Sequence, residues 1–319
     1  MKLKTLPVIR VAVTLVLMTA LIYMVRGSIP KMFDAITRLS VSILFLGFLL
    51  FLLSNFIVSF RLKILLDTQD IFLTIPYIVR LTFMSYFFSS FLPTSVGGDV
   101  VKAIYISKAS NRAVLSYTSV FIDRFIGMVT IFLIAITAFF YTKEAPKTYF
   151  MWLLLLLAIS GLFLIFLFNR RFAKIFTFFV TPLVSDKLKE IFRNIYDAMH
   201  NFKNYRLKIM ECFAISILGQ AVAFAAIYVF ALGLNSYISF KFALFAMSMA
   251  SIVSMLPSIY GMGPREMSIV VILGPVIGKD KALAIAFLWL GLLLTTALIG
   301  GIIYGLMGQH RIRPSTLPK

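Results

Sequence analysis

The sequence predicts an all-α, multi-pass membrane protein with about six full transmembrane helices and two broken, re-entrant helical hairpins. Composition is the first reason: 61% of the 319 residues are hydrophobic and only 13% are charged, whereas a soluble domain carries about 25% charged residues. The second reason is a series of apolar segments near the ~20 residues that a helix needs to cross a bilayer. The third is a short sequence that interrupts an apolar region twice.

Six apolar segments predict the full-length transmembrane helices. No clear signal-peptide cleavage site follows the first segment, so we expect it to remain as an uncleaved helix. Between the fourth and fifth, nine basic residues are interleaved with apolar ones, which favours either an amphipathic helix at the cytoplasmic membrane surface or a solvated connector. The six segments are residues 7–25, 39–60, 114–140, 150–168, 210–232 and 282–307.

The repeated sequence reads Ser-x-Leu-Pro-[Ser/Thr]-x-x-Gly. Its copies begin at Ser90 and Ser254, 164 positions apart. Paired Pro/Gly breaks in corresponding parts of a hydrophobic chain are typical of transporters with inverted repeats and broken helices. We therefore expect one membrane domain, residues 1–319. Its related halves are about 1–168 and 210–307, joined by the basic cytoplasmic segment 169–209.

Each copy forms an elbow between two apolar arms. The arm after each elbow is too short to cross a bilayer comfortably, so we interpret each region as a hairpin that enters the membrane and returns to its own side. Each elbow should also place the free N–H groups of a helix N-terminus inside the membrane. The arms are residues 71–92 and 99–107, then 242–256 and 264–277; the elbow residues are Pro93, Gly97 and Gly98, then Pro257, Gly261 and Gly263.

Loop charges favour a cell-membrane orientation with both termini in the cytoplasm. The cytoplasmic segments then hold 20 lysines and arginines and the outer segments hold 8, as the positive-inside rule requires. In this orientation the first hairpin enters from the cytoplasm and the second from outside. The net charge of +19 does not indicate nucleic-acid binding, because the basic residues are scattered among apolar spans.

Ionisable residues within or beside the apolar segments are the candidate substrate-binding residues. A charge at the centre of a transmembrane helix costs about 2.5–3.5 kcal/mol, so such residues usually pair and often line a pathway. Two interpretations remain open: ion pairs that only hold helices together, or contacts with a substrate. The candidates are Arg80, Asp99, Lys102, Asp123, Arg124, Arg265 and Glu266.

Asp123 and Arg124 are neighbours in the middle of one predicted helix. Adjacent helical residues point about 100° apart and cannot pair well with each other, so we expect both to find partners on other helices. The expected partners are Asp99 or Glu266 for Arg124, and Arg80 or Lys102 for Asp123.

The elbows have a chemistry of their own. We expect Asp99 to cap the helix after the first elbow. After the second, we expect Pro264 at the first helical position and Glu266 in the first turn. Capping alone would explain both acids. With Lys102 or Arg265 nearby, however, the same helix N-termini also make a site for phosphate or carboxylate.

No cofactor is expected. The single cysteine, Cys212, and the distant His200 and His310 offer no metal-ligand cluster. The chain also lacks the phosphate-binding loop that would indicate ATP.

Two motifs resemble a known family. Leu-Pro-Thr-Ser-Val-Gly-Gly-Asp-Val-Val-Lys-Ala at residues 92–103, followed by Val-Phe-Ile-Asp-Arg-Phe-Ile-Gly at 120–127, resembles the flippase-like transmembrane family. That family includes the membrane half of lysylphosphatidylglycerol synthases (multiple peptide resistance factors) and the membrane part of some archaeal dolichol-phosphate glycosyltransferases. Residues 257–266 look like its second motif. The resemblance implies movement of an anionic or phosphate-linked lipid between leaflets.

The sequence departs from these relatives at both ends. We expect no acyltransferase-like domain after Lys319 and no glycosyltransferase domain before Met1. We therefore expect a stand-alone lipid translocator, passive or ion-coupled, and not an enzyme. Its expected partner is a phosphate-bearing membrane lipid, and its oligomeric state is open, a homodimer included. The alternatives are a membrane enzyme acting on a lipid phosphate and a small-solute secondary transporter on the same scaffold.

Overall fold

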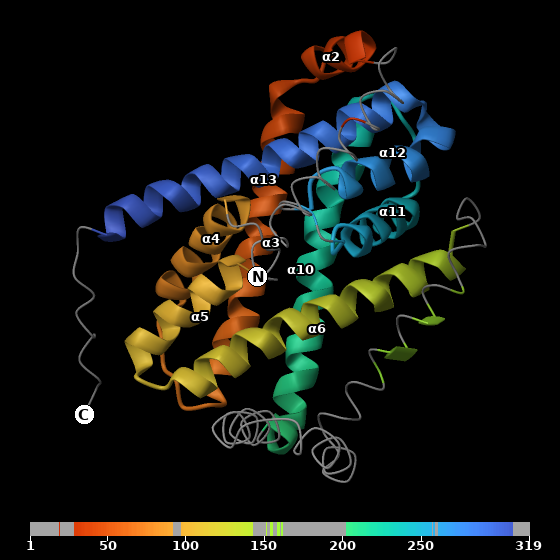
Figure 1. Cartoon of the computed structure of the whole chain (residues 1–319). Helices are drawn as coiled ribbons and strands as arrows, with labels where there is room; N and C mark the ends of the chain where they lie inside the picture. Colours follow the sequence, from red (N-terminus) through yellow and green to blue (C-terminus); the bar gives the residue numbers. More distant parts are fainter. Residues whose placement is uncertain are drawn as a thin grey trace, which may run out of the picture.

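The computed structural model describes residues 29–91, 97–142, 202–256, 258 and 261–308, with residue 19 and six isolated positions between 151 and 161. Over this part of the chain the fold is all-helical, with nine α-helices, one 3-10 helix and no strand (Figure 1), which agrees with the predicted class. The predicted span 7–25, most of 150–168, residues 169–201, Pro93 and Pro257 lie outside the described residues.

The described helices follow the predicted segments closely. In chain order they are α2 (Ile29–Thr37), α3 (Val41–Asp67), α4 (Ile75–Phe91), α5 (Gly97–Ser110), α6 (Ala113–Phe140), η3 (Phe202–Tyr205), α10 (Arg206–Gly233), α11 (Phe240–Val253), α12 (Pro264–Ile277) and α13 (Lys279–Gly308).

Among the described helices, α3, α6, α10 and α13 are long and apolar enough to cross a membrane. They correspond to four of the six predicted spans. The main difference is in α3, which continues to Asp67 instead of ending at Phe60. Lys63 forms an ion pair with Asp67 one turn later, which supports this extension.

A long helix, two shorter helices and a second long helix occur twice in this order, as α3–α4–α5–α6 and as α10–α11–α12–α13. The contacts repeat as well. The first short helix of each set packs on the last helix of the other set: α4 packs on α13, and α11 packs on α6. The second short helix packs on the last helix of its own set: α5 packs on α6, and α12 packs on α13. The central α3 and α10 pack against each other. Figure 1 shows the α4–α5 and α11–α12 pairs on opposite sides of this central pair.

Helix ends at corresponding positions share an unusual backbone conformation. Asp70 after α3 and Asn235 after α10 have φ angles of 55° and 51°. Asn111 after α5 and Gly278 after α12 have φ angles of 56° and 89°. Gly, Asn and Asp tolerate this left-handed region better than other residues and often end helices there. The likeness between the two sets of helices therefore extends to their connections.

The central helices α3 and α10 run antiparallel. A side chain added at Gly47, near the start of α3, would meet Phe230, near the end of α10. A Cβ on Gly219, in the first half of α10, would lie 2.8 Å from Val58 Cγ2, in the second half of α3. The C-terminal ends of α3 and α10 consequently lie at opposite ends of the molecule.

Both ends of the α4–α5 pair lie at the C-terminal end of α3. Arg112, between α5 and α6, donates a 3.0 Å hydrogen bond from Nη1 to the carbonyl of Gln69, and this nitrogen lies 3.9 Å from the Asp70 carboxylate. Both ends of the α11–α12 pair lie at the C-terminal end of α10, where Lys281 Nζ donates a 3.3 Å hydrogen bond to the Asn235 carbonyl. Each helix pair thus begins and ends at the same end of the molecule, and the two pairs do so at opposite ends.

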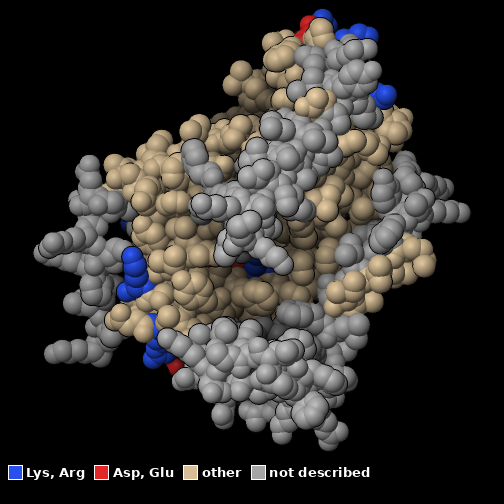
Figure 2. Space-filling model, in the orientation of Figure 1, with Lys and Arg blue, Asp and Glu red and all other residues tan. Residues whose placement is uncertain are grey.

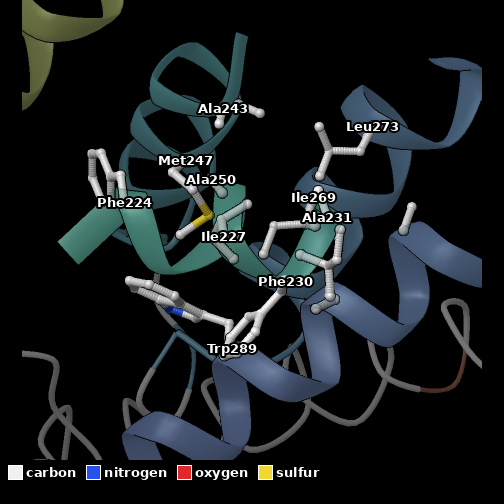
Figure 3. Close-up of a cluster of buried hydrophobic side chains, with 14 of the residues drawn as sticks. Phe224, Ile227, Phe230, Ala231, Ala243, Met247, Ala250, Ile269, Leu273 and Trp289 are labelled. Carbon is white, nitrogen blue, oxygen red and sulfur yellow. The ribbon is translucent and has the colours of Figure 1, made fainter. Parts of the chain in front are cut away.

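The largest apolar core lies among α10, α11, α12 and α13 (Figure 3). Phe224, Ile227 and Phe230 of α10 meet Met247 of α11 and Trp289 of α13, and all five are buried. Among the described residues, α3, α5 and α6 bury three charged side chains, Arg61, Lys102 and Asp123, whereas α10–α13 bury one, Glu266. The two sets of helices therefore share an arrangement but differ in chemistry.

Candidate functional site

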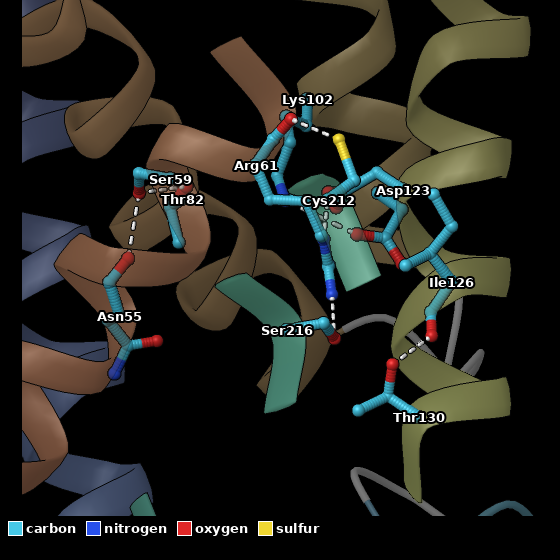
Figure 4. A network of polar contacts seen from close by, with 11 residues as sticks. Asn55, Ser59, Arg61, Thr82, Lys102, Asp123, Ile126, Thr130, Cys212 and Ser216 are labelled. Atoms are coloured by element: carbon cyan, nitrogen blue, oxygen red, sulfur yellow. Dashed lines mark hydrogen bonds and ion pairs between the residues drawn. The ribbon is translucent and has the colours of Figure 1, made fainter. Parts of the chain in front are cut away.

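A buried arginine joins three of the candidate membrane spans. Arg61 of α3 is 4% exposed. Its Nε donates a 2.7 Å hydrogen bond to Asp123 Oδ1 on α6, and its Nη1 donates a 2.7 Å hydrogen bond to Ser216 Oγ on α10 (Figure 4). Gly127 provides the necessary room, since a Cβ there would lie 3.2 Å from Arg61 Nη1. The result is a neutral, hydrogen-bonded pair, the form in which charges are normally buried.

The predicted partners of Asp123, Arg80 and Lys102, are wrong. The predicted span 39–60 leaves Arg61 in the loop that follows, whereas α3 continues to Asp67 and Arg61 is buried. The helical spacing of polar residues in the sequence is the signal that could have predicted the burial of Arg61. Ser54, also buried, precedes Arg61 by two helical turns and so lies on the same face.

Arg124 points to a different helix from its neighbour Asp123 and pairs with Asp99 of α5. This contact confirms that the two neighbours find separate partners, and it selects Asp99 from the two predicted partners of Arg124. Asp99 Oδ1 also lies 3.6 Å from Lys102 Nζ. One carboxylate therefore lies between two cations, and the local charge of the three residues is +1.

Arg124 is far more open than the residues around it. Its side chain is 46% exposed, against 16% for Asp99 and 8% for Lys102. It is the twelfth of the 28 residues of α6, well inside a candidate span. A charge at that depth requires water or a polar group and not hydrocarbon. Figure 2 shows basic and acidic atoms together in a hollow near the middle of the face, amid uncharged residues and residues that are not described.

The first helical turn of α5 is pressed against α4. A Cβ on Gly98 would meet the carbonyl oxygen of Ser85, so only glycine permits this approach. Gly97 and Gly98 begin α5 and are buried. The prediction that Asp99 caps this helix is wrong, because α5 begins two residues earlier and Asp99 lies in its first turn. Asp99 is instead placed to face Arg124.

The second elbow ends where predicted, with Pro264 at the start of α12 and Glu266 in its first turn. Gly263 precedes the helix with a φ of 91°, a conformation that favours glycine. Its N–H donates a 2.7 Å hydrogen bond to Glu266 Oε2. Glu266 is 0% exposed, and its Oε1 has no hydrogen-bond partner in the described part of the chain.

Arg265 bends back over the elbow, since a Cβ on Gly261 would lie 2.7 Å from its Nη2. Gly261 itself has a φ of 73°.

Tyr86 of α4 is partly buried and lies near charges that come from beside both elbows. The charges of Asp99, Arg265, Arg124 and Arg61 all act on its hydroxyl group. Because electrostatic interactions weaken with distance, these four residues, from four different helices, all lie within electrostatic reach of this hydroxyl group, and we call them the charged cluster. The structure thus brings charges from both elbows together.

Arg80, by contrast, does not join this cluster. It is exposed on α4 and has no hydrogen bond or ion pair within the residues that the structure describes.

Comparison with known families gives a match over most of the chain. The matching family is described as "Lysylphosphatidylglycerol synthase TM region", and the match covers residues 8–301. It includes both elbows and every member of the charged cluster. Among curated proteins no match is found.

Proposed function

The chain belongs to the lysylphosphatidylglycerol synthase TM-region family, and we propose that it translocates a lipid between the leaflets of the cell membrane without changing it chemically. The lipid is a phospholipid or a polyprenyl-phosphate-linked lipid. The observation that carries this proposal is the position of Arg124: a half-exposed cation well inside a candidate span, next to a buried neutral pair. Cations at such depth commonly mark a substrate path.

In this proposal the phosphate of the headgroup binds Arg124. A guanidinium suits phosphate because it can donate two parallel hydrogen bonds. In the present structure the Asp99 carboxylate takes that position. Lys102, 3.6 Å from Asp99, offers the carboxylate another partner when the headgroup arrives. Arg265 and the N-terminus of α12 add positive potential from the second elbow.

The Arg61–Asp123 pair has a positioning role in this mechanism. It contributes no net charge, and its hydrogen bonds connect α3, α6 and α10. Asp123 is held toward α3, so the next residue, Arg124, is directed to α5 and the open side. Headgroup contact and helix packing are thereby divided between two adjacent residues.

We further propose that α4–α5 and α11–α12 are re-entrant hairpins of an inverted repeat, with both chain termini in the cytoplasm. The 17 residues of α4 and the 14 of α5 extend about 26 and 21 Å at 1.5 Å per residue, less than the ~30 Å hydrocarbon layer. The proposal is supported by the ends of each pair, which lie together, and by the opposite ends of the molecule from which the pairs start.

Arg124→Gln in proteoliposomes tests the proposed function. The rate at which fluorescent phosphatidylglycerol in the inner leaflet becomes accessible to an impermeant reductant should fall about 10- to 100-fold, since hydrogen bonds to charged groups contribute about 1.5–3 kcal/mol. Arg80→Gln, from outside the cluster, should keep the wild-type rate. Equal rates in a folded Arg124→Gln protein would refute the assignment. A change in lipid mass during the assay would indicate an enzyme.

A further inference from the structure

An apolar groove opens among α2, α3, α10 and α13. Its volume is about 400 Å³, within the ~300–1,000 Å³ typical of small-molecule sites. Its lining includes Phe48, Phe230 and Phe287, and among the described lining residues Thr295 has the one polar side chain. The Thr295 hydroxyl already donates a 2.8 Å hydrogen bond to the Gly291 carbonyl. The described lining therefore offers a ligand no other polar side chain, and its chemistry favours hydrocarbon.

Gly291 on α13 is the least obstructed point of the groove. No atom lies within 4 Å of the position that a Cβ on Gly291 would occupy. Further along the same helix, a Cβ on Gly300 would collide with the carbonyl of Phe83 and one on Gly301 would lie 2.8 Å from the Phe87 ring. The helix is thus packed tightly on α4 but is open toward the groove at Gly291.

The groove lies on helices that face the bilayer. Three of its four walls, α3, α10 and α13, are candidate membrane spans. Phe45 and Leu294, next in sequence to lining residues, are exposed large hydrophobic side chains. The lining on α13 runs from Phe287 to Thr295, about 12 Å at 1.5 Å per residue. An elongated apolar groove in this setting suits one extended hydrocarbon chain.

Gly291 and Arg124 are corresponding positions in the repeated helix arrangement. Asn111 and Gly278, which precede α6 and α13, are 167 positions apart, and the same offset carries Arg124 to Gly291. On the α6 side, hydrogen bonds from Arg61 close the contact with the two central helices. Among the described residues no hydrogen bond joins α13 to the helical residues of α3 or α10, and the groove lies beside these contacts. At these corresponding positions one repeat therefore carries the half-exposed Arg124 and the other carries a glycine with open space around it.

We propose that this groove binds one hydrocarbon chain, acyl or prenyl, of a membrane lipid. The further statement that this is a chain of the transported lipid rests on the proposed function. The groove then guides the tail on α13 while the charged cluster on α6 and both elbows handles the headgroup. This division follows from the contrast between the two corresponding positions.

Gly291→Phe tests the proposal, because its Cβ has open space around it and its ring would occupy part of the groove. Gly305→Phe is a matched control: Gly305 is also on α13 with no atom within 4 Å of its Cβ position, and it does not line the groove. Each full-length protein is reconstituted with phosphatidylglycerol that carries a photoactivatable diazirine on one acyl chain. After irradiation, labelled residues are identified by mass spectrometry.

Wild type and Gly305→Phe should be labelled more strongly at Phe287 and Thr295 than at Leu298, an exposed residue outside the lining. Labelling in the groove should fall about tenfold in Gly291→Phe, because the displaced methylenes lose their apolar contacts. Equal labelling of all three proteins overturns the proposal, since it indicates ordinary bilayer contact. Wild-type labelling that is no stronger in the groove than at Leu298 overturns it too.

The transport rate separates this inference from the proposed function. Gly291→Phe should slow movement of fluorescent phosphatidylglycerol, and Gly305→Phe should not. If Gly291→Phe moves lipid at the wild-type rate while Arg124→Gln is slow, the groove does not hold the transported chain and the proposed function stands. If both variants transport normally, the proposed function itself fails.

Discussion

Asp123 and Arg61 form a 2.7 Å ion pair between α6 and α3 that is almost completely buried. The same guanidinium reaches Ser216 on α10, so one side chain connects three of the four candidate spans of the described structure. Removing one partner of such a pair leaves an uncompensated buried charge, which is much more unfavourable than losing the pair as a whole.

Asp123→Asn should therefore destabilise the protein by about 3–5 kcal/mol, measured as a loss of thermal stability in detergent. The double variant Arg61→Met with Asp123→Leu should recover most of this loss, because no charge is left behind. The exposed pair Arg38–Asp34 is the control, and Arg38→Gln should change stability by less than about 1 kcal/mol. If the double variant is no more stable than Asp123→Asn, the loss comes from the missing bonds of the pair itself and not from an uncompensated buried charge.

Asp99→Asn should strengthen binding of an anionic headgroup. The substitution removes the carboxylate that pairs with Arg124 and raises the charge of the three-residue group from +1 to +2. We expect the Kd for a soluble short-chain phosphatidylglycerol to fall about tenfold, in keeping with the ~1.5–3 kcal/mol of a charged hydrogen bond. Asp67→Asn, at another acid–lysine pair, should leave the Kd unchanged. Weaker binding by Asp99→Asn would mean that the carboxylate helps to form the site.

Gly98→Ala should loosen the first helix pair. The new methyl group would meet the Ser85 carbonyl, which belongs to the α4 backbone and cannot rotate away. Overpacking of this kind costs about 1–3 kcal/mol, visible as a lower unfolding temperature. Gly305→Ala, with open space at its Cβ, should be neutral or stabilising because alanine favours a helix by about 1 kcal/mol. Equal unfolding temperatures for the two variants would contradict the close contact.

Two variants of Glu266 can show whether this residue only caps α12 or also binds substrate. Glu266→Gln keeps an oxygen that can accept the Gly263 N–H hydrogen bond, so stability should stay within about 1 kcal/mol, whereas Glu266→Ala should lose about that amount. If the carboxylate also meets substrate, Glu266→Gln should slow lipid transport in proteoliposomes despite its normal stability. Wild-type transport by this variant would restrict Glu266 to capping.

Much of the architecture could be predicted because its causes are local. The four described spans follow from runs of apolar residues, and α12 begins at Pro264 because proline suits the first position of a helix. The paired breaks also follow from glycine and proline chemistry. The separate partners of Asp123 and Arg124 were predictable from helix geometry alone, because neighbouring side chains diverge.

The identity of those partners depended on the folded chain. Arg61 is 62 positions from Asp123, and an arginine at the end of an apolar run is stable in a loop as well as in a helix. Burial becomes favourable only when Asp123 and Ser216 arrive from other helices to satisfy its donors. Local composition therefore set the helices and their breaks. Packing between distant helices decided which charges are buried as pairs, which one is left open, and where an apolar groove remains.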